Sequence, residues 1–297
     1  MRSCFRTHLL KNLRETFGGE VKELQIYRTP GTPNLQLRKN DENVTEVSAK
    51  EHSRYRTGTG MLLYLVKHSR PDISNPVRIL TKFVSQPTVA AVKEMKRVIK
   101  YVLDTADYGL KIFPTEIKEG NWEMTIYTDS DWAGDKDSRR SVSGFILYLM
   151  NVPILWRSRQ QKSVTLSSTE AEYVSLSEAA KEIRFVYYIM VSMGLRVRLP
   201  IVVQVDNVGA IFMSENVTTS QRTRHVDIRH AFVREMVLDG FLKVVFVRTH
   251  DNLSDGFTKN VSADIHERHT PSYVMPREEV NNGHRNREGV GTSVSDP

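Results

Sequence analysis

Apolar residues occur in short alternating or continuous runs from about residue 122 onward, a pattern typical of strands. The predicted strands are 124–131, 142–149, 154–158, 200–205 and 241–247. Three stretches instead repeat apolar residues at helical spacing, so we expect helices at about 168–190, from 207 onward and at 225–238. A short helix is also expected near residue 252. This order predicts an α/β layer with a mixed sheet.

The chain outside that region has a different pattern. Residues 1–50 are mostly polar, contain the break TPGTP at 29–33 and show no long apolar period, so we expect a loosely ordered segment. Helical spacing appears at 60–68 and again after Pro87, and predicts a helical segment over 51–120. After about residue 270 Leu, Ile, Phe and Trp are absent, so residues 263–297 are predicted to form a disordered tail.

Composition and charge narrow the possible functions. The longest apolar runs have six residues, whereas a membrane-spanning helix needs about 20, so no membrane segment is expected. The start lacks the pattern of a signal peptide, and the single Cys4 cannot form an internal disulfide, which together favour a cytoplasmic or nuclear protein. Lys and Arg number 42 against 35 Asp and Glu, and the net charge of +7 favours a polyanionic partner.

Four acidic residues lie where a folded core does not normally accept an unpaired charge. Asp129 lies inside the first predicted strand, Asp206 ends the strand at 200–205, and Asp255 begins the last helical stretch. The fourth is a glutamate on the long helix. Carboxylates that converge from strands and a helix suit hard cations such as Mg²⁺, and two such ions about 3.5–4 Å apart can promote phosphodiester cleavage. The alternative is that each acid is a surface charge or a helix cap.

The long helix offers two glutamates, and their positions distinguish them. Glu170 lies three residues after Ser167, the spacing of a capping box, so helix capping accounts for it. Glu172 belongs to a stripe that must face the sheet and that continues with Leu176, Ala179, Ile183, Val186 and Met190. A carboxylate on that face is costly unless something pairs with it, so Glu172 is the predicted metal ligand.

Several motifs, in order and spacing, resemble the ribonuclease H domain of copia-type retrotransposon Gag-Pol polyproteins, with the end of the reverse transcriptase before it. They are YTDSDWAG at 127–134, SRRSVSG at 138–144, LSSTEAEY at 166–173, VDN at 205–207, GAI at 209–211, RTRHVD at 222–227, SD at 254–255 and FTK at 257–259. The resemblance covers roughly residues 50–262. It implies a ribonuclease H-like fold over 121–262, with a mixed five-stranded sheet flanked by helices. A helical polymerase-connection segment at 51–120 and a remnant of reverse transcriptase at 1–50 would precede it.

The resemblance also implies an activity and a site. It places the metal-binding and catalytic acids at Asp129, Glu172, Asp206 and Asp255, with two Mg²⁺ or Mn²⁺ ions as cofactors. The implied reaction is hydrolysis of the RNA strand of an RNA–DNA hybrid during reverse transcription, and the upstream reverse transcriptase domain is the implied partner. An intact element would carry the protein in a virus-like particle. The candidate nucleic-acid contacts are Arg139, Arg140, Asn207, Arg224 and His225.

The chain departs from the family pattern in three places. It has His230-Ala231-Phe232 where the family has an aromatic residue, His and Phe, and Gly256 follows Asp255. No Asp-Asp pair occurs, so DNA synthesis by this chain is not expected. Transposase-like enzymes share the architecture but take their glutamate from a helix after two aspartates, whereas Glu172 precedes Asp206. A catalytically silent nucleic-acid-binding fragment of a decayed polyprotein stays open as an alternative.

Overall fold

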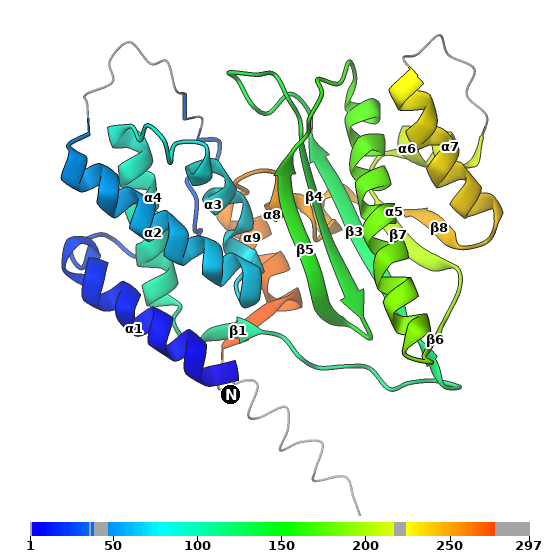
Figure 1. The fold of residues 1–297 in the computed structure, drawn as a ribbon, viewed down its shortest axis with the longest axis horizontal. Helices are drawn as coiled ribbons and strands as arrows, with labels where there is room; N and C mark the ends of the chain where they lie inside the picture. The colour runs from blue at the N-terminus through cyan, green and yellow to red at the C-terminus, as the bar shows by residue number, and fades with distance from the viewer. Residues whose placement is uncertain (1, 36, 39–46, 217–223, 277–297) are drawn as a thin grey trace, which may run out of the picture.

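The computed structural model describes residues 2–35, 37–38, 47–216 and 224–276, and at its centre is a mixed five-stranded sheet (Figure 1). The strands lie in the order β5-β4-β3-β7-β8. They are β3 (Met124–Asp131), β4 (Val142–Leu149), β5 (Val152–Gln160), β7 (Ile201–Val205) and β8 (Leu242–Phe246). β3, β7 and β8 are parallel, and β4 is antiparallel to both β3 and β5. The mixed five-stranded sheet of a ribonuclease H-like fold is therefore confirmed.

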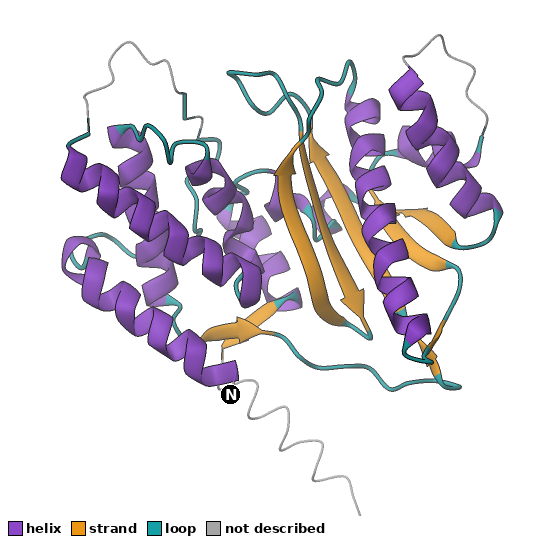
Figure 2. Ribbon diagram, viewed as in Figure 1, coloured by secondary structure: helices purple, strands orange, loops and turns teal. Residues whose placement is uncertain are grey.

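Helices cover both faces of this sheet (Figure 2). One face packs against α5 (Ser168–Ser192), α6 (Val208–Glu215) and α7 (Arg224–Leu238) in the largest apolar core. The short helix α8 (Asp255–Thr258) packs against β3 and β4, and its Phe257 shares a smaller core with Ile146 and Tyr148 of β4. Alternate residues of β4 thus face opposite cores, as expected of a strand buried on both sides.

The helix α5 presents the predicted stripe to the sheet. Leu176, Ala179 and Ile183 are fully buried, and Glu172 on the same stripe is only 6% exposed. Ser167 caps the helix, because its hydroxyl accepts a hydrogen bond from the N–H of Glu170 at 3.1 Å. The Glu170 carboxylate accepts from the N–H of Leu166 at 2.8 Å, one residue earlier than in a capping box. The assignment of Glu172 to the sheet and of Glu170 to the helix cap is confirmed.

The described residues between 2 and 104 form a second, helical core. It contains α1 (Arg2–Val21), α2 (Ala49–His68), α3 (Ser74–Thr81) and α4 (Val89–Asp104), with the 3-10 helix η1 (Pro71–Ile73) between α2 and α3. The expectation of a loosely ordered segment over 1–50 is wrong for α1, since Leu13 and Phe17 are fully buried. α1 packs against α2 and α4, and this packing stabilises it, as it does most helices.

The expected disordered tail is wrong for residues 263–276. They form α9 (Ala263–His269), the 3-10 helix η3 (Thr270–Ser272) and β9 (Val274–Pro276). β9 pairs antiparallel with β1 (Tyr108–Leu110), and Tyr273 and Val274 are buried. The composition could not show this pairing, because the partner strand lies far earlier in the chain. Residues 277–297 lie outside the described residues.

β2 (Asn121–Trp122) pairs in parallel with β6 (Arg196–Val197), and the two strands form a separate two-stranded sheet. Among the described residues no helix is both long and apolar enough to cross a membrane. The boundaries proposed at 50, 120 and 262 stay predictions.

The basic flank of α4 faces the protein more than the solvent. Lys96 forms an ion pair with Glu20 of α1 at 2.9 Å, and Arg97 donates to the carbonyl of Thr29 at 3.2 Å. Lys100 pairs with Asp104 one turn further along the same helix. These contacts tie α4 to its neighbours, so most of this flank is not an open phosphate-binding surface.

The helical segment lies beside β5, the edge strand of the sheet (Figure 1). The indole N–H of Trp156 on β5 donates to the carbonyl of Val66 on α2 at 2.8 Å. Arg78 of α3 donates to the hydroxyl of Ser158 on β5 at 3.1 Å. The two cores are therefore joined by polar contacts of β5, which β4 separates from β3, the strand of Asp129.

Candidate metal centre

Three of the four predicted acids meet at one edge of the sheet. Asp129 lies in β3, Asp206 directly follows β7, and Glu172 lies on α5 above them. The register pairs Tyr127 with Gln204, so Asp129 and Asp206, each two residues further along parallel strands, lie side by side. One carboxylate oxygen from each of the three acids lies within 4.8 Å of the others. This spacing allows all three to contact one cation.

Glu172 is held by one oxygen and leaves the other without a partner. Its Oε1 accepts hydrogen bonds from the backbone N–H and the hydroxyl of Ser130, at 3.0 and 2.9 Å. Its Oε2 is buried and has no hydrogen-bond partner among the described residues. A buried carboxylate oxygen without a partner is costly. The donor set fits a hard divalent cation, because all three residues offer carboxylate oxygens.

Burial and mutual repulsion disfavour the charged forms of these acids. Burial, together with the charge of Asp255, raises the pKa of Asp129 to about 6. Burial and the charges of Asp129 and Asp206 raise the pKa of Glu172 well above its ordinary value. Burial and Asp129 also raise the pKa of Asp206. A bound divalent cation would lower these pKa values again, because it favours the ionised carboxylates.

The fourth predicted acid lies beside the group but has a cation of its own. Asp255 is 1% exposed, and its Oδ1 lies 2.7 Å from the Nζ of Lys259, one turn further along. Burial raises the pKa of Asp255, and Lys259 opposes that rise. Lys259 was not singled out from the sequence. The spacing of four residues after Asp255 was the available signal, since such pairs face each other on a helix.

α8 reaches the centre because β4 has a glycine opposite Asp129. A Cβ added at Gly144 would lie 2.6 Å from Cγ2 of Thr258 and 2.8 Å from Cβ of Phe257. The missing side chain lets α8 approach the sheet, where the Thr258 hydroxyl donates to Oδ2 of Asp129. The Thr258 hydroxyl is also 3.0 Å from the carbonyl of Asp255. Ser130 and Thr258 lie within the quoted motifs, but no charge marked them as functional.

The predicted nucleic-acid contacts have different environments. Arg139 and Arg140 are exposed in the turn between β3 and β4, and neither forms an ion pair among the described residues. Asn207 caps α6, because its side chain accepts from the N–H of Ala210 at 3.0 Å. Arg224 and His225 begin α7, and their side chains lie outside the described residues.

His230 and His250 lie in different environments. His230 is buried and stacks on the ring of Tyr173, with centroids 4.0 Å apart and an interplanar angle of 18°. His230, the buried residue of the departure at 230–232, is therefore part of the core, whereas Ala231 is exposed. His250 is exposed, and its Nε2 lies 3.2 Å from Asp251.

The chain is similar in sequence to Pol polyproteins of plant transposons. No protein-family model matches the chain. The chain is 39% identical over 211 residues, 71% of its length, to the retrovirus-related Pol polyprotein from transposon RE1 of Arabidopsis thaliana. It is 33% identical over 244 residues, 81% of its length, to the retrovirus-related Pol polyprotein from transposon TNT 1-94 of Nicotiana tabacum. The matched regions are 14% and 18% of those polyproteins, so the chain spans less than a fifth of either.

A solved structure is also similar. LC11-RNase H1, isolated from compost by a metagenomic approach, matches with a TM-score of 0.37 and 16% sequence identity. The match covers 46% of this chain and 92% of that one.

Proposed function

The chain belongs to the copia-type retrovirus-related Pol polyproteins, and on that premise we propose that it hydrolyses the RNA strand of RNA–DNA hybrids with divalent metal ions. The observation that carries the proposal is the buried Oε2 of Glu172, which has no hydrogen-bond partner among the described residues. This oxygen belongs to a group of three carboxylates that share one small space. A stable fold has no other evident use for such an arrangement.

Asp129, Glu172 and Asp206 would hold a divalent ion such as Mg²⁺ or Mn²⁺, and Asp255 would help to hold a second. Bound ions of this kind supply positive charge near the attacking water and the leaving oxygen of a phosphodiester. Ser130 fixes the orientation of Glu172 through two hydrogen bonds. Thr258 orients Asp129 through one hydrogen bond. Both acids are thus aligned before any ligand binds.

The hydroxyl groups near the acids support hydrolysis by water rather than a covalent intermediate. The Ser130 hydroxyl donates to Glu172, and the Thr258 hydroxyl donates to Asp129. In the proposed metal-bound state both carboxylates would be metal ligands, so neither would be free to act as the general base that an activated serine or threonine nucleophile needs. We therefore assign both hydroxyls to the positioning of carboxylates and take the nucleophile to be water.

The surface beside the acids supports a nucleic-acid substrate. Arg139 and Arg140 are exposed in the turn that connects the strand of Asp129 to β4, and the whole chain carries a net charge of +7. Contacts between such cations and phosphates do not depend on the base sequence of the nucleic acid, and they weaken as the salt concentration rises. We propose an RNA–DNA hybrid as the substrate and an upstream reverse transcriptase domain of the same polyprotein as the partner.

A strand-specific cleavage assay tests the proposal. The chain is incubated with a hybrid that carries different labels on its RNA and DNA strands, with Mg²⁺, with Mn²⁺ or with EDTA. We expect cleavage of the RNA strand only, and only with metal. Equal cleavage of both strands, or activity in EDTA, would overturn the proposal. Hybrid binding without cleavage in either metal would instead support a catalytically silent fragment.

A further inference from the structure

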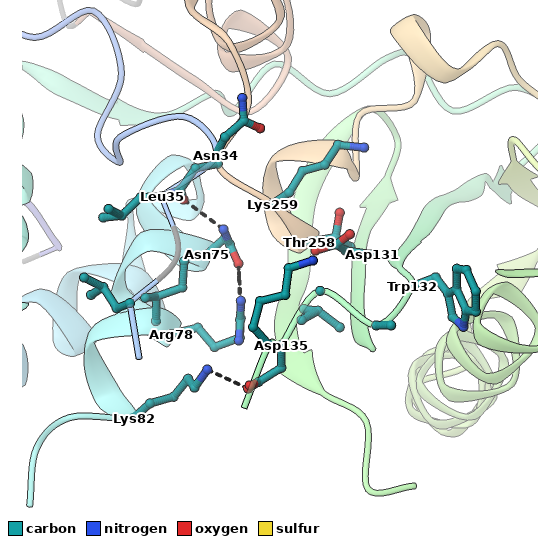
Figure 3. A pocket seen from close by; sticks show the side chains of 17 residues that line it. Asn34, Leu35, Asn75, Arg78, Lys82, Asp131, Trp132, Asp135, Thr258 and Lys259 are labelled. Atoms are coloured by element: carbon teal, nitrogen blue, oxygen red, sulfur yellow. Dashed lines mark hydrogen bonds and ion pairs between the residues drawn. The ribbon is translucent and has the colours of Figure 1, made fainter. Parts of the chain in front are cut away.

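A polar cleft of about 240 Å³ separates the helical segment from the sheet (Figure 3). One wall is α3, and the other is formed by the start of the β3–β4 loop and the end of α8. Its charged lining residues are Arg78, Lys82, Lys136, Lys259, Asp131 and Asp135. Four cations therefore face two carboxylates, and Lys259 links the cleft to Asp255 of the metal centre.

Arg78 is held in a fixed orientation inside this cleft. Its Nε and Nη2 donate to Oδ1 of Asn75 at 3.1 and 2.7 Å, and its Nε also lies 3.1 Å from the hydroxyl of Ser158. Asn75 in turn donates to Asn260, just after α8, at 2.9 Å. Figure 3 shows the guanidinium of Arg78 in contact with Asn75. The arginine is thus aligned by neutral groups of α3 and β5.

Arg78 differs from the other deeply placed arginine of the helical segment. Arg70 is buried and forms an ion pair with Asp72 at 2.6 Å. No carboxylate lies within ion-pair distance of Arg78 among the described residues, and its Nη1 has no hydrogen bond there. Burial lowers the pKa of Arg78 to about 10, although the charges of Asp135 and Asp131 oppose that fall. An arginine that is mostly buried without a direct ion-pair partner is costly.

The carboxylates of the cleft are not free to neutralise Arg78. Asp135 accepts from Lys82 at 2.5 Å, from the Gln160 amide, and from the backbone N–H groups of Asp137 and Ser138. Asp131 lies beyond ion-pair distance of Arg78, since no such contact occurs. The cleft therefore keeps a net positive charge around an arginine that is already oriented.

We propose that Arg78 forms a phosphate-binding subsite on the helical segment, which holds the backbone of the nucleic acid whose RNA strand reaches the metal centre. The guanidinium group is suited to this ligand, because its planar array of N–H donors matches phosphate oxygens. Lys136 adds charge along the same cleft, whereas Lys259 is paired with Asp255. The inference rests on the proposed function for the identity of the ligand, and it makes the helical segment part of the substrate site.

Binding to chemically modified hybrids tests this subsite. Hybrids with a single neutral methylphosphonate at successive positions of the DNA or RNA strand are titrated by fluorescence anisotropy, without added metal. For the wild type, we expect one or two positions at which the modification weakens binding several-fold. For Arg78→Gln, we expect several-fold weaker binding to the unmodified hybrid and no further loss at those positions. The salt dependence of its binding should also be smaller by about one phosphate contact.

Two control variants separate the subsite from general effects. Arg78→Lys keeps the charge and should bind between the wild type and Arg78→Gln. Arg56→Gln removes an exposed arginine of α2 that does not line the cleft, and should leave binding and the methylphosphonate profile unchanged. Thermal melts of all variants establish that each is folded.

The outcomes distinguish this inference from the proposed function. If Arg78→Gln is folded and keeps the affinity and profile of the wild type, the subsite is wrong, even if the chain cleaves hybrids. If the wild type shows the position-specific loss but never cleaves RNA, the subsite stands and the proposed hydrolysis fails. A wild type that does not bind hybrids at all would contradict both.

Discussion

The buried pair Arg70–Asp72 of the helical segment and the three acids of the sheet are opposite cases of buried charge. In the helical segment, the guanidinium of Arg70 contacts Asp72 at 2.6 Å and donates to both oxygens of Thr105. At one end of the central strands, Asp129, Glu172 and Asp206 share a small space, and none of them forms an ion pair among the described residues. The same chain can therefore pair its buried charges, and at these three acids it does not. This difference marks the acids as functional, because unpaired buried charges lower stability.

The comparison predicts opposite effects of neutralisation. Removing a charge from the Arg70–Asp72 pair should destabilise the protein, because the remaining charge is left buried. Removing a charge from the three acids should stabilise the metal-free protein, because it relieves burial and repulsion. It should also remove activity, so stability and function change in opposite directions at the metal centre.

The largest expected effect is the loss of activity on Glu172→Gln. A neutral amide keeps the shape of the side chain but removes the charge that a divalent ion needs, so cleavage of the RNA strand should fall below detection. Glu170→Gln is the matched control on the same helix, and its activity should stay within a few-fold of the wild type. A single-turnover assay in Mg²⁺ gives both rates. If Glu170→Gln were inactive and Glu172→Gln active, the assignment of the two glutamates would be wrong.

The next effect concerns the paired charges of the helical segment. Asp72→Asn should lower the free energy of unfolding by roughly 3–5 kcal/mol, because it leaves Arg70 buried without a counter-charge. Asp104→Asn breaks the more exposed pair with Lys100 and should cost less than about 1 kcal/mol. Chemical denaturation measures both values. Equal losses would show that burial does not set the importance of these pairs.

Asp129→Asn should stabilise the metal-free protein at neutral pH. The pKa of Asp129 is raised to about 6, so the folded state binds a proton more tightly than the unfolded state. This tighter proton binding stabilises the folded state fully below about pH 4, and the stabilisation is lost as pH rises through about 6. The loss of folding free energy amounts to ~3 kcal/mol. The advantage of the variant over the wild type should therefore be largest at pH 7.5 and shrink toward pH 4. Melts in EDTA across this range test it, and a constant difference would contradict the assignment.

A smaller effect is expected where α8 packs on the sheet. Gly144→Ala places a methyl group 2.6 Å from Thr258, so it should cost about 1–3 kcal/mol and reduce cleavage through displacement of Thr258 and Asp255. Gly60→Ala is the control, because no atom lies within 4 Å of the added carbon on α2. It should stabilise the helix by up to about 1 kcal/mol. Denaturation and cleavage assays of the pair test this, and full activity of Gly144→Ala would contradict the role of that contact.

The parts of the fold with a strong local pattern were predictable from the sequence. The predicted strands 124–131 and 142–149 agree with β3 and β4, and the apolar stripe placed Glu172 against the sheet. α1 and β9 were not predicted, because each depends on a partner distant in the chain. α1 packs against α4, and β9 pairs with β1.

The site also contains residues that the sequence predicts and residues that only the packing reveals. Asp129, Glu172 and Asp206 were predictable, since each is a charge in an apolar setting. The pairing of Asp255 with Lys259 needs the packing of α8 against the sheet, which Gly144 permits. Arg78 could not be identified from the sequence, because no motif or spacing distinguishes it from the other Lys and Arg residues, which together number 42. Its unpaired state appears only when both walls of the cleft are in place.

Metal binding by the three unpaired acids is the most direct test of this account. Thermal melts at pH 7.5 would compare the wild type, Glu172→Gln and Glu170→Gln with and without Mg²⁺ or Mn²⁺. The account predicts that metal raises the melting temperature of the wild type and of Glu170→Gln, because an ion that binds only the folded state stabilises it. It predicts no such rise for Glu172→Gln, whose metal-free form should melt above the metal-free wild type. Equal metal-induced shifts in all three proteins would show that these acids are not a metal site.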